Sequence, residues 1–234
     1  MGTDIRTFME VKPDDQWELI GPRWKPSYWD YLPEEQRQLS HRPYSNRNYT
    51  VFGVLANVRN GRGFGGADLG DPVTPIAMPK GEPADMSKGL FALINDTPDD
   101  EAQERLGNHD FSHLTLAEMA AYDWEHPMTH RGVITLDEYK LWRQLPPTWP
   151  NGGYAAAVSG TKVRTLTPEQ ADERLDANEP SGDLHYYVHI TWQSSIAEAC
   201  ADFFPAILQE MREVAKEYNL TSEDRVRLVF GFDS

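Results

Sequence analysis

The sequence contains a single cysteine, Cys200, among 234 residues. One thiol cannot form a disulfide within the chain, so a disulfide-stabilised scaffold is excluded. Cys200 lies among alanines in a segment of helical composition, and we interpret it as a small buried residue rather than a nucleophile. The chain also lacks Gly-x-Ser-x-Gly, P-loop, His-Glu-x-x-His and Cys-x-x-Cys motifs, so the common hydrolase, kinase and zinc-ribbon assignments find no support.

Basic residues and long apolar runs are also scarce. The chain has 22 lysines and arginines against 37 aspartates and glutamates, which gives a net charge of −15. Such a charge repels nucleic-acid phosphates and anionic membrane surfaces, so we expect neither as a partner. No apolar run reaches the length of a membrane span, and residues 1–6 show no signal-peptide character, which together predict a cytoplasmic protein.

The apolar content is nevertheless sufficient for a folded core, since 39% of the residues are hydrophobic and 11% are aromatic. Alternating or β-rich segments predict strands at 4–11, 17–20, 184–192 and 225–232. Because strands lie at both ends with helices between them, we predict one compact α+β domain over residues 1–234. We expect a mixed, mostly antiparallel sheet that contains both terminal strands, is covered by helices and is joined by long Gly/Pro loops.

Several local signals predict helices. Asn46 is placed to cap a helix over residues 47–58, and residues 86–94 form a short helical segment. Three Thr-x-x-Glu or Thr-x-x-Gln signatures predict capped helices that begin after Thr115, Thr135 and Thr167. A longer helix is expected over residues 194–218, broken or kinked at Pro205 because proline cannot donate to the helical ladder.

Four segments carry a recognisable pattern: MGTDIR at 1–6, RNYTVF running into LANVRN over 47–60, SHLTLAE at 112–118 and VRLVFGFD at 226–233. They resemble a family of bacteriophage and actinobacterial proteins without an assigned function. Its members open Met-Gly-Cys-Asp-Ile-His, share the Arg-Asn-Tyr helix and end near Phe-Asp-Asn. This chain differs at Thr3, Arg6 and Ser234, so a Cys/His site at those positions would be missing here. The resemblance implies a phage or phage-like origin, a shared fold and the host cytoplasm as location.

A set of polar residues in and beside these segments is the first candidate binding site: Asp4, Arg47, Asn48, Tyr49, Arg59, Asn60 and Asp233. Arginine presents a fixed fork of donors and asparagine offers both donor and acceptor, which suits planar anionic or base-like groups. If the terminal strands are neighbours, Asp4 and Asp233 approach each other. The alternative is structural: the aspartates pair with Arg47 or Arg59 and fix a helix to the sheet.

Six of the seven histidines occur in pairs four residues apart: His109/His113, His126/His130 and His185/His189. On a helix this spacing places two imidazoles on one face, as in two-ligand zinc sites. The last pair lies on a predicted strand, where four residues span about 13 Å, so it cannot share an ion. His109, Asp110 and His113 remain candidate metal ligands, alone or with the second pair. Ordinary surface or core histidines are the alternative.

Two loops complete the candidates. Residues 61–66 formally match GxGxxG, but they follow a predicted helix rather than a strand, so we reject a dinucleotide-binding fold. We expect a plain connector there, or a ligand-closing loop that includes Arg59 and Arg62. An aromatic group is formed by Trp24, Tyr28, Trp29, Tyr31 and Tyr44. It either stacks on a base or protein partner, or covers the sheet in place of a helix.

These observations favour three functions. The leading one is the capture of a small anionic or nucleotide-like ligand through Arg47, Asn48 and Arg59, and countering a host nucleotide-signalling defence is one use. The first alternative is a metal-dependent hydrolase of a small phosphorylated substrate, with ligands around His109. The second is an acidic protein that inhibits a host protein by mimicking nucleic-acid charge through residues 96–104. Cofactors, catalysis and homo-oligomer formation stay open.

Overall fold

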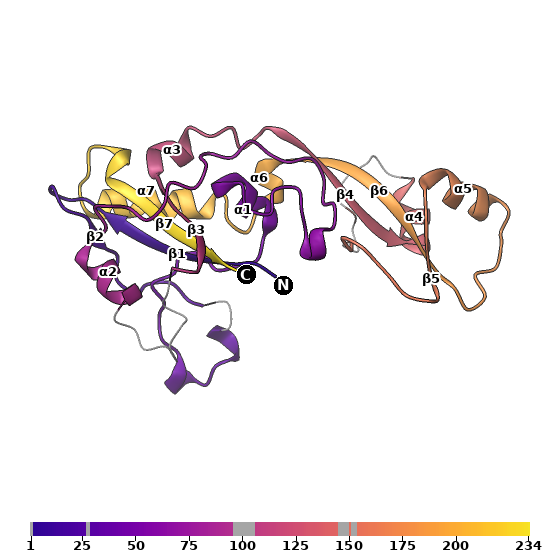
Figure 1. The fold of residues 1–234 in the computed structure, drawn as a ribbon, viewed down its shortest axis with the longest axis horizontal. Coiled ribbons are helices and arrows are strands. Elements are labelled where there is room, and N and C mark those ends of the chain that lie inside the picture. Colours follow the sequence, from indigo (N-terminus) through magenta and orange to yellow (C-terminus); the bar gives the residue numbers. More distant parts are fainter. Residues whose placement is uncertain (1, 27–28, 96–105, 145–149, 151–153) are drawn as a thin grey trace. The chain divides into compact units, whose positions relative to one another are not determined.

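The computed structural model describes residues 2–26, 29–95, 106–144, 150 and 154–234. The chain divides into two compact units (Figure 1). The first unit contains Met1–Val58, Thr74–Asp123 and Cys200–Ser234, and the second contains Arg59–Val73 and Trp124–Ala199. The predicted α+β class is confirmed, and the single domain expected over residues 1–234 stays a prediction. Within the described residues, no helix combines the length and apolarity needed to cross a membrane.

The first unit is built on an antiparallel four-stranded sheet of order β2-β1-β7-β3 (Figure 1). β1 (Asp4–Val11) pairs along its whole length with β7 (Val226–Asp233), so the two predicted terminal strands are neighbours. β2 (Glu18–Leu19) pairs with the end of β1 as the expected hairpin partner. β3 (His109–Thr115), where the sequence analysis predicted no strand, pairs with the other side of β7.

Helices cover both faces of this sheet. Alternation along β7 places Val226, Leu228, Phe230 and Phe232 on one face, as their spacing predicted. On that face Phe52 of α1 (Tyr49–Ala56) packs against Phe232, with ring centroids 5.1 Å apart. On the opposite face Leu90 of α2 (Lys88–Asn95) joins a buried cluster with Phe8, Leu106 and Val229.

The observed N-caps of the helices agree with most, but not all, of the caps predicted from the sequence. All three predicted capping boxes are present, and they open α3 (Leu116–Ala120), α4 (Leu136–Trp142) and α5 (Pro168–Asp176). α1, in contrast, begins later than predicted, because Asn48 rather than Asn46 is its N-cap. Asn48 has an extended backbone, so its side-chain oxygen can accept hydrogen bonds from the Thr50 and Val51 amides at 3.0 and 3.3 Å.

The helix expected over residues 194–218 is interrupted before Pro205, in agreement with the predicted break, although the interruption is longer than a kink. The chain forms α6 (Ile196–Ala199) and α7 (Ala206–Glu217) instead, with Pro205 at the N-cap of α7. Proline is tolerated there because the first turn of a helix has no use for its missing amide hydrogen. Short 3₁₀ turns lie at η1 (Trp29–Tyr31), η2 (Glu34–Gln36), η3 (Phe64–Gly66) and η5 (Glu223–Arg225).

The second unit has its own sheet, of order β4-β6-β5. β6 (His185–Ser195) extends the strand predicted at 184–192, and it pairs antiparallel with β4 (Pro127–Thr135). β5 (Val163–Leu166) pairs parallel with its other edge. The strands in the described parts of the chain therefore form two sheets in place of the one expected. β4 escaped prediction because its proline, histidine, arginine and glycine interrupt any alternation of apolar residues.

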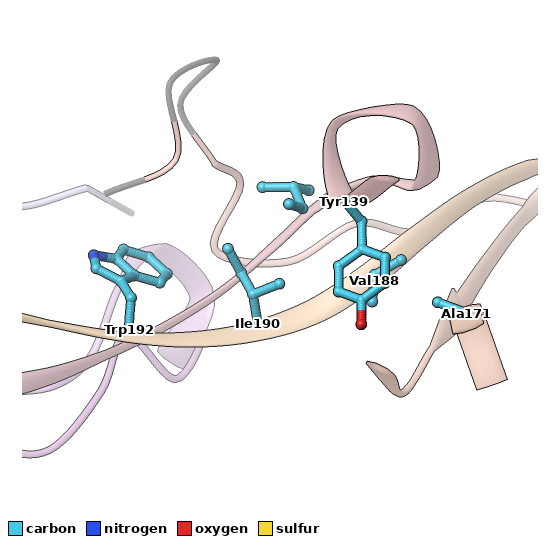
Figure 2. Close-up of a cluster of buried hydrophobic side chains, with 6 residues drawn as sticks. Tyr139, Ala171, Val188, Ile190 and Trp192 are labelled. Carbon is cyan, nitrogen blue, oxygen red and sulfur yellow. The ribbon is translucent and has the colours of Figure 1, made fainter. Parts of the chain in front are cut away.

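The core of the second unit lies on one face of β6 (Figure 2). Val188, Ile190 and Trp192 point to this face, and Tyr139 from α4 and Ala171 from α5 pack against them. The residues between them on β6 point to the other face, in agreement with the alternation of side chains along a strand. His185 and His189 are exposed on that face of β6.

Candidate functional site

Five of the seven predicted binding residues lie in the first unit, at the end of its sheet where β1 begins and β7 ends. Asp4 and Asp233 are register partners there, so the two aspartates do approach each other. Arg47 donates two hydrogen bonds of 2.7 and 2.9 Å to Oδ1 of Asp4, and Arg6 donates one of 2.7 Å to Asp233. The hydrogen bond to Asp4 raises the pKa of Arg47. These pairs match the structural alternative, with Arg6 as a partner that the sequence did not indicate.

Asn48 and Tyr49 also serve the fold. The Asn48 side-chain oxygen caps α1, and its amide nitrogen donates to Asp202 at 2.8 Å. The Tyr49 hydroxyl accepts a hydrogen bond from the Thr3 amide at 3.4 Å. The side chain of Asn48 is thus committed at both ends, which argues against its predicted role as a ligand-binding group.

The remaining two residues of the set, Arg59 and Asn60, belong to the second unit. Asn60 exchanges two hydrogen bonds with the backbone of Val73, at 2.7 and 2.8 Å. Residues 61–69, which include the Gly-rich segment, form a closed loop, because the Leu69 amide donates to the Gly61 carbonyl at 3.0 Å. This geometry fits the connector alternative for residues 61–66.

The local charge at the end of the first sheet opposes an anion. The contacts there involve four aspartates, namely Asp4, Asp110, Asp202 and Asp233. They involve two arginines, Arg6 and Arg47. Because each carboxylate repels an anionic ligand, this surplus makes the end of the sheet a poor anion site.

The predicted metal trio is not assembled. β3 carries a bulge between His109 and Ser112, and Asp110 has a left-handed backbone with φ 49°. The extra residue changes the alternation, so His109 aligns with Phe232 and His113 with Val229, on opposite faces of the sheet. His109 contacts Asp110 and Ser234 at 2.7 and 2.8 Å. Across the described residues, no three His, Cys, Asp or Glu side chains gather as metal ligands.

A buried charge network in the first unit was missed by the sequence analysis. Arg227 is 3% exposed and Glu10 is fully buried, and they are joined by hydrogen bonds of 2.8 Å. Arg227 also donates to Asp85 at 2.7 Å and lies over the Trp17 ring at 3.9 Å. Burial opposes ionisation of Asp85, yet its hydrogen bonds to Arg227 and Trp17 lower its pKa. The available signal was an opposite charge in each of the two apolar terminal strands, Glu10 in β1 and Arg227 in β7.

The described members of the aromatic group differ in burial: one covers the core, and another is exposed on the surface. Tyr44 is buried and packs edge-on against Phe203 with ring centroids 4.9 Å apart, as expected for a residue that covers the core. Tyr31 is 89% exposed. It lies beyond a backbone bridge between Trp24 and Ser40 that closes the base of its loop. The side chains of Tyr28 and Trp29 fall outside the described part of the chain.

Two cavities open on the surface of the first unit. The first, of about 630 Å³, lies beside the start of α2, and its charged lining is mainly acidic, with Asp15, Glu18 and Asp85 against Lys88. The second, of about 470 Å³, lies at the end of α7, and we call it the α7 cavity. It is lined by Leu116, Arg212, Ala215, Lys216, Asn219, Leu220, Thr221, Ser222 and Glu223. Its charged lining has two cations and one acid, which is the chemistry of an anion site.

The end of α7 explains why this cavity presents side chains rather than bare carbonyls. Asn219 takes a left-handed backbone with φ 52°. Its amide donates to the Lys216 carbonyl at 3.1 Å, and the Leu220 amide donates to the Ala215 carbonyl at 2.9 Å. This pair of bonds is the Schellman arrangement, which satisfies the last carbonyls of a helix. The negative end of α7 is therefore partly covered, and Lys216 offsets it further.

The charge surplus is concentrated in the first unit, which holds 25 acidic and 14 basic residues, a net charge of −11. The second unit holds 12 acidic and 8 basic residues, a net charge of −4. The acidic face expected from residues 96–104 falls outside the described part of the chain. An inhibitor that mimics nucleic-acid charge thus stays a prediction.

No protein-family model, curated protein or solved structure matches the chain. The resemblance to the phage and actinobacterial family therefore stays a prediction. Two of the positions at which the chain differs from that family, Thr3 and Ser234, lie together, because their hydroxyl oxygens are 3.1 Å apart. The functional conclusion rests on the side chains and cavities of the chain itself.

Proposed function

We propose that this protein binds a small anionic, nucleotide-like ligand in the α7 cavity. The main support is the lining, where Arg212 and Lys216 outnumber the single acid Glu223 although the whole chain carries a charge of −15. Two cations on one wall create a local positive potential that a uniformly acidic surface would lack. The ligand class is the one expected from the sequence, whereas the residues that hold the ligand are different.

The size and the neutral lining of the cavity also suit this ligand. Its volume of about 470 Å³ lies within the range of small-molecule sites, roughly 300–1,000 Å³. Ala215 and Leu220, both partly exposed, supply apolar surface for a base, and Asn219 and Thr221 supply hydrogen-bonding groups. A cavity with an apolar wall and a few cations binds an amphipathic anion better than a fully hydrated inorganic ion.

The biological use that we propose is sequestration. A phage-encoded protein that removes a signalling nucleotide from the host cytoplasm would weaken a defence that depends on that signal. This use rests on the resemblance to the phage family, while ligand binding in the α7 cavity rests on the lining alone.

The direct test is a thermal-unfolding series with AMP, adenosine and pyrophosphate at matched ionic strength. AMP and adenosine share a base and a sugar, so their difference isolates the phosphate. A ligand at about 100 times its Kd adds roughly 2.7 kcal/mol to the free energy of unfolding, which raises Tm by several degrees. We expect AMP and pyrophosphate to raise Tm and adenosine to have a much smaller effect.

A matched pair of variants locates the site. Lys216→Gln removes a cation from the last turn of α7, and Lys140→Gln makes the same change in the last turn of α4, where Lys140 is exposed. The Tm increase should fall in Lys216→Gln and persist in Lys140→Gln. If the ligand-induced Tm increase falls equally in both variants, the effect is a nonspecific effect of charge. No Tm increase with any anion in the unmodified protein would overturn the proposal.

A further inference from the structure

The α7 cavity contains a loose ion pair. Nε of Arg212 lies 3.9 Å from Oε1 of Glu223, and the two side chains are 55% and 49% exposed. This distance exceeds that of a hydrogen bond, so the two groups interact only through their charges. In the same unit, by comparison, Arg47 and Asp4 approach to 2.7 Å. A loose, half-exposed pair is one that an incoming ligand can exchange at little cost.

The second cation of the cavity lies one turn away. Residues four apart lie on the same face of a helix, so Arg212 and Lys216 are neighbours along α7. The carbonyls of Ala215 and Lys216 already accept hydrogen bonds from Leu220 and Asn219. Among the described lining residues, Glu223 is therefore the one full negative charge with which a ligand must compete.

From this geometry we infer that the ligand carries a phosphoryl group with at least two negative charges, which bridges Arg212 and Lys216 and displaces Glu223. The inference rests on the proposed function, because it names the ligand class of the same cavity. A phosphoryl group presents several oxygens to two cations at once, whereas a carboxylate monoanion carries half the charge or less. Since Coulomb energy scales with charge, the ligand with the higher charge gains more from the cation pair.

The competition with Glu223 can be measured by calorimetric titration with pyrophosphate and with acetate, at constant ionic strength and without divalent ions. Glu223→Gln keeps the size of the side chain and removes its charge, so we expect pyrophosphate to bind about two- to fivefold more tightly. The affinity for acetate should rise by a smaller factor in Glu223→Gln, because Glu223 repels the single charge of acetate less strongly. Lys216→Gln should weaken pyrophosphate binding by about fivefold.

The control for net charge is Glu213→Gln. Glu213 lies on the same helix but does not line the cavity, and it accepts a hydrogen bond from Gln209 at 2.9 Å. This variant removes one negative charge from α7 outside the cavity, so we expect pyrophosphate affinity to stay within twofold of that of the unmodified protein. An increase equal to that of Glu223→Gln would assign the effect to overall charge and overturn the displacement.

The outcomes also separate this inference from the proposed function. If pyrophosphate, AMP and acetate all fail to bind the unmodified protein and Glu223→Gln, ligand binding in the cavity is itself refuted. If pyrophosphate binds but Glu223→Gln leaves its affinity unchanged or lowers it, only the displacement is refuted. Glu223→Ala repeats the same affinity measurement with the side chain removed. Its circular dichroism and Tm are compared with those of the unmodified protein to check that it is folded.

Discussion

At the scale of single residues, the contrast between two arginines shows how burial decides the role of a charge. Arg47 is half-exposed beside Asp4, and a pair of this kind contributes about 0–1 kcal/mol because water screens both partners. Arg227 is 3% exposed against a fully buried Glu10, so neither group can turn to water if its partner is lost. An arginine–carboxylate pair thus has different consequences in the two places.

This contrast predicts the effect of one substitution at two sites. Arg227→Met leaves Glu10 buried without its counter-charge, and we expect the free energy of unfolding to fall by about 3–5 kcal/mol. Arg47→Met removes an exposed pair and should cost less than about 1 kcal/mol. Urea unfolding followed by circular dichroism measures both values. Similar losses in the two variants would contradict the burial of the Arg227 network.

At the scale of elements, β7 shows how a central strand is fitted to its surroundings. Its Gly231 aligns with Arg6 of β1. A methyl group at Gly231 would contact the carbonyl oxygen of Leu106 and lie 2.6 Å from a ring carbon of Phe111. The segment before β3 can therefore pack closely on β7 only because position 231 has no side chain.

Gly231→Ala should accordingly push this segment away from β7. Overpacking of this kind costs about 1–3 kcal/mol, and we expect a loss of that size in the free energy of unfolding. Gly21→Ala is the matched control, because no atom lies within 4 Å of an added methyl group there. It should change stability by less than about 0.5 kcal/mol. Equal Tm values for Gly231→Ala and the unmodified protein would show that the segment does not pack as described.

At the scale of the whole molecule, each unit holds a histidine that is withdrawn from water, partly buried at His113 and buried at His130. Burial lowers the pKa of His113 in the first unit, and the charges of Arg227 and Lys80 lower it further. Burial also lowers the pKa of His130 in the second unit, where Glu198 acts in the opposite direction. In the unfolded chain both imidazoles take up protons near their ordinary pKa of 6.5. The unfolded state therefore binds more protons than the folded state just below this pH.

It follows that stability is present above about pH 6.5 and is lost as the pH falls below it. We expect the urea midpoint to be lower at pH 5.5 than at pH 7.5, an interval that brackets the ordinary pKa of histidine. His113→Gln should reduce this pH dependence, and His185→Gln, at an exposed position of β6, should leave it in place. A urea midpoint that does not change between the two pH values would contradict the burial of both histidines.

Features whose causes lie within a few residues could be predicted from the sequence alone. The capping boxes after Thr115, Thr135 and Thr167 and the terminal strands follow from short patterns of hydrogen-bonding and apolar residues. The same patterns could not reveal β3 or β4, because polar side chains and, in β3, a bulge interrupt the alternation.

Which distant groups meet depends on the packing of the whole chain and could not be predicted from local patterns. Glu10 and Arg227 are 217 positions apart, and Arg6, which the sequence analysis did not single out as a partner, donates to Asp233. Such pairings depend on strand register and on the order of strands in a sheet, and a shift of one residue would turn each side chain to the other face. The α7 cavity likewise combines α3, α7 and the segment after it, whose proximity no local pattern encodes. Propensities act locally, whereas charge pairing and cavity shape depend on how the whole chain packs.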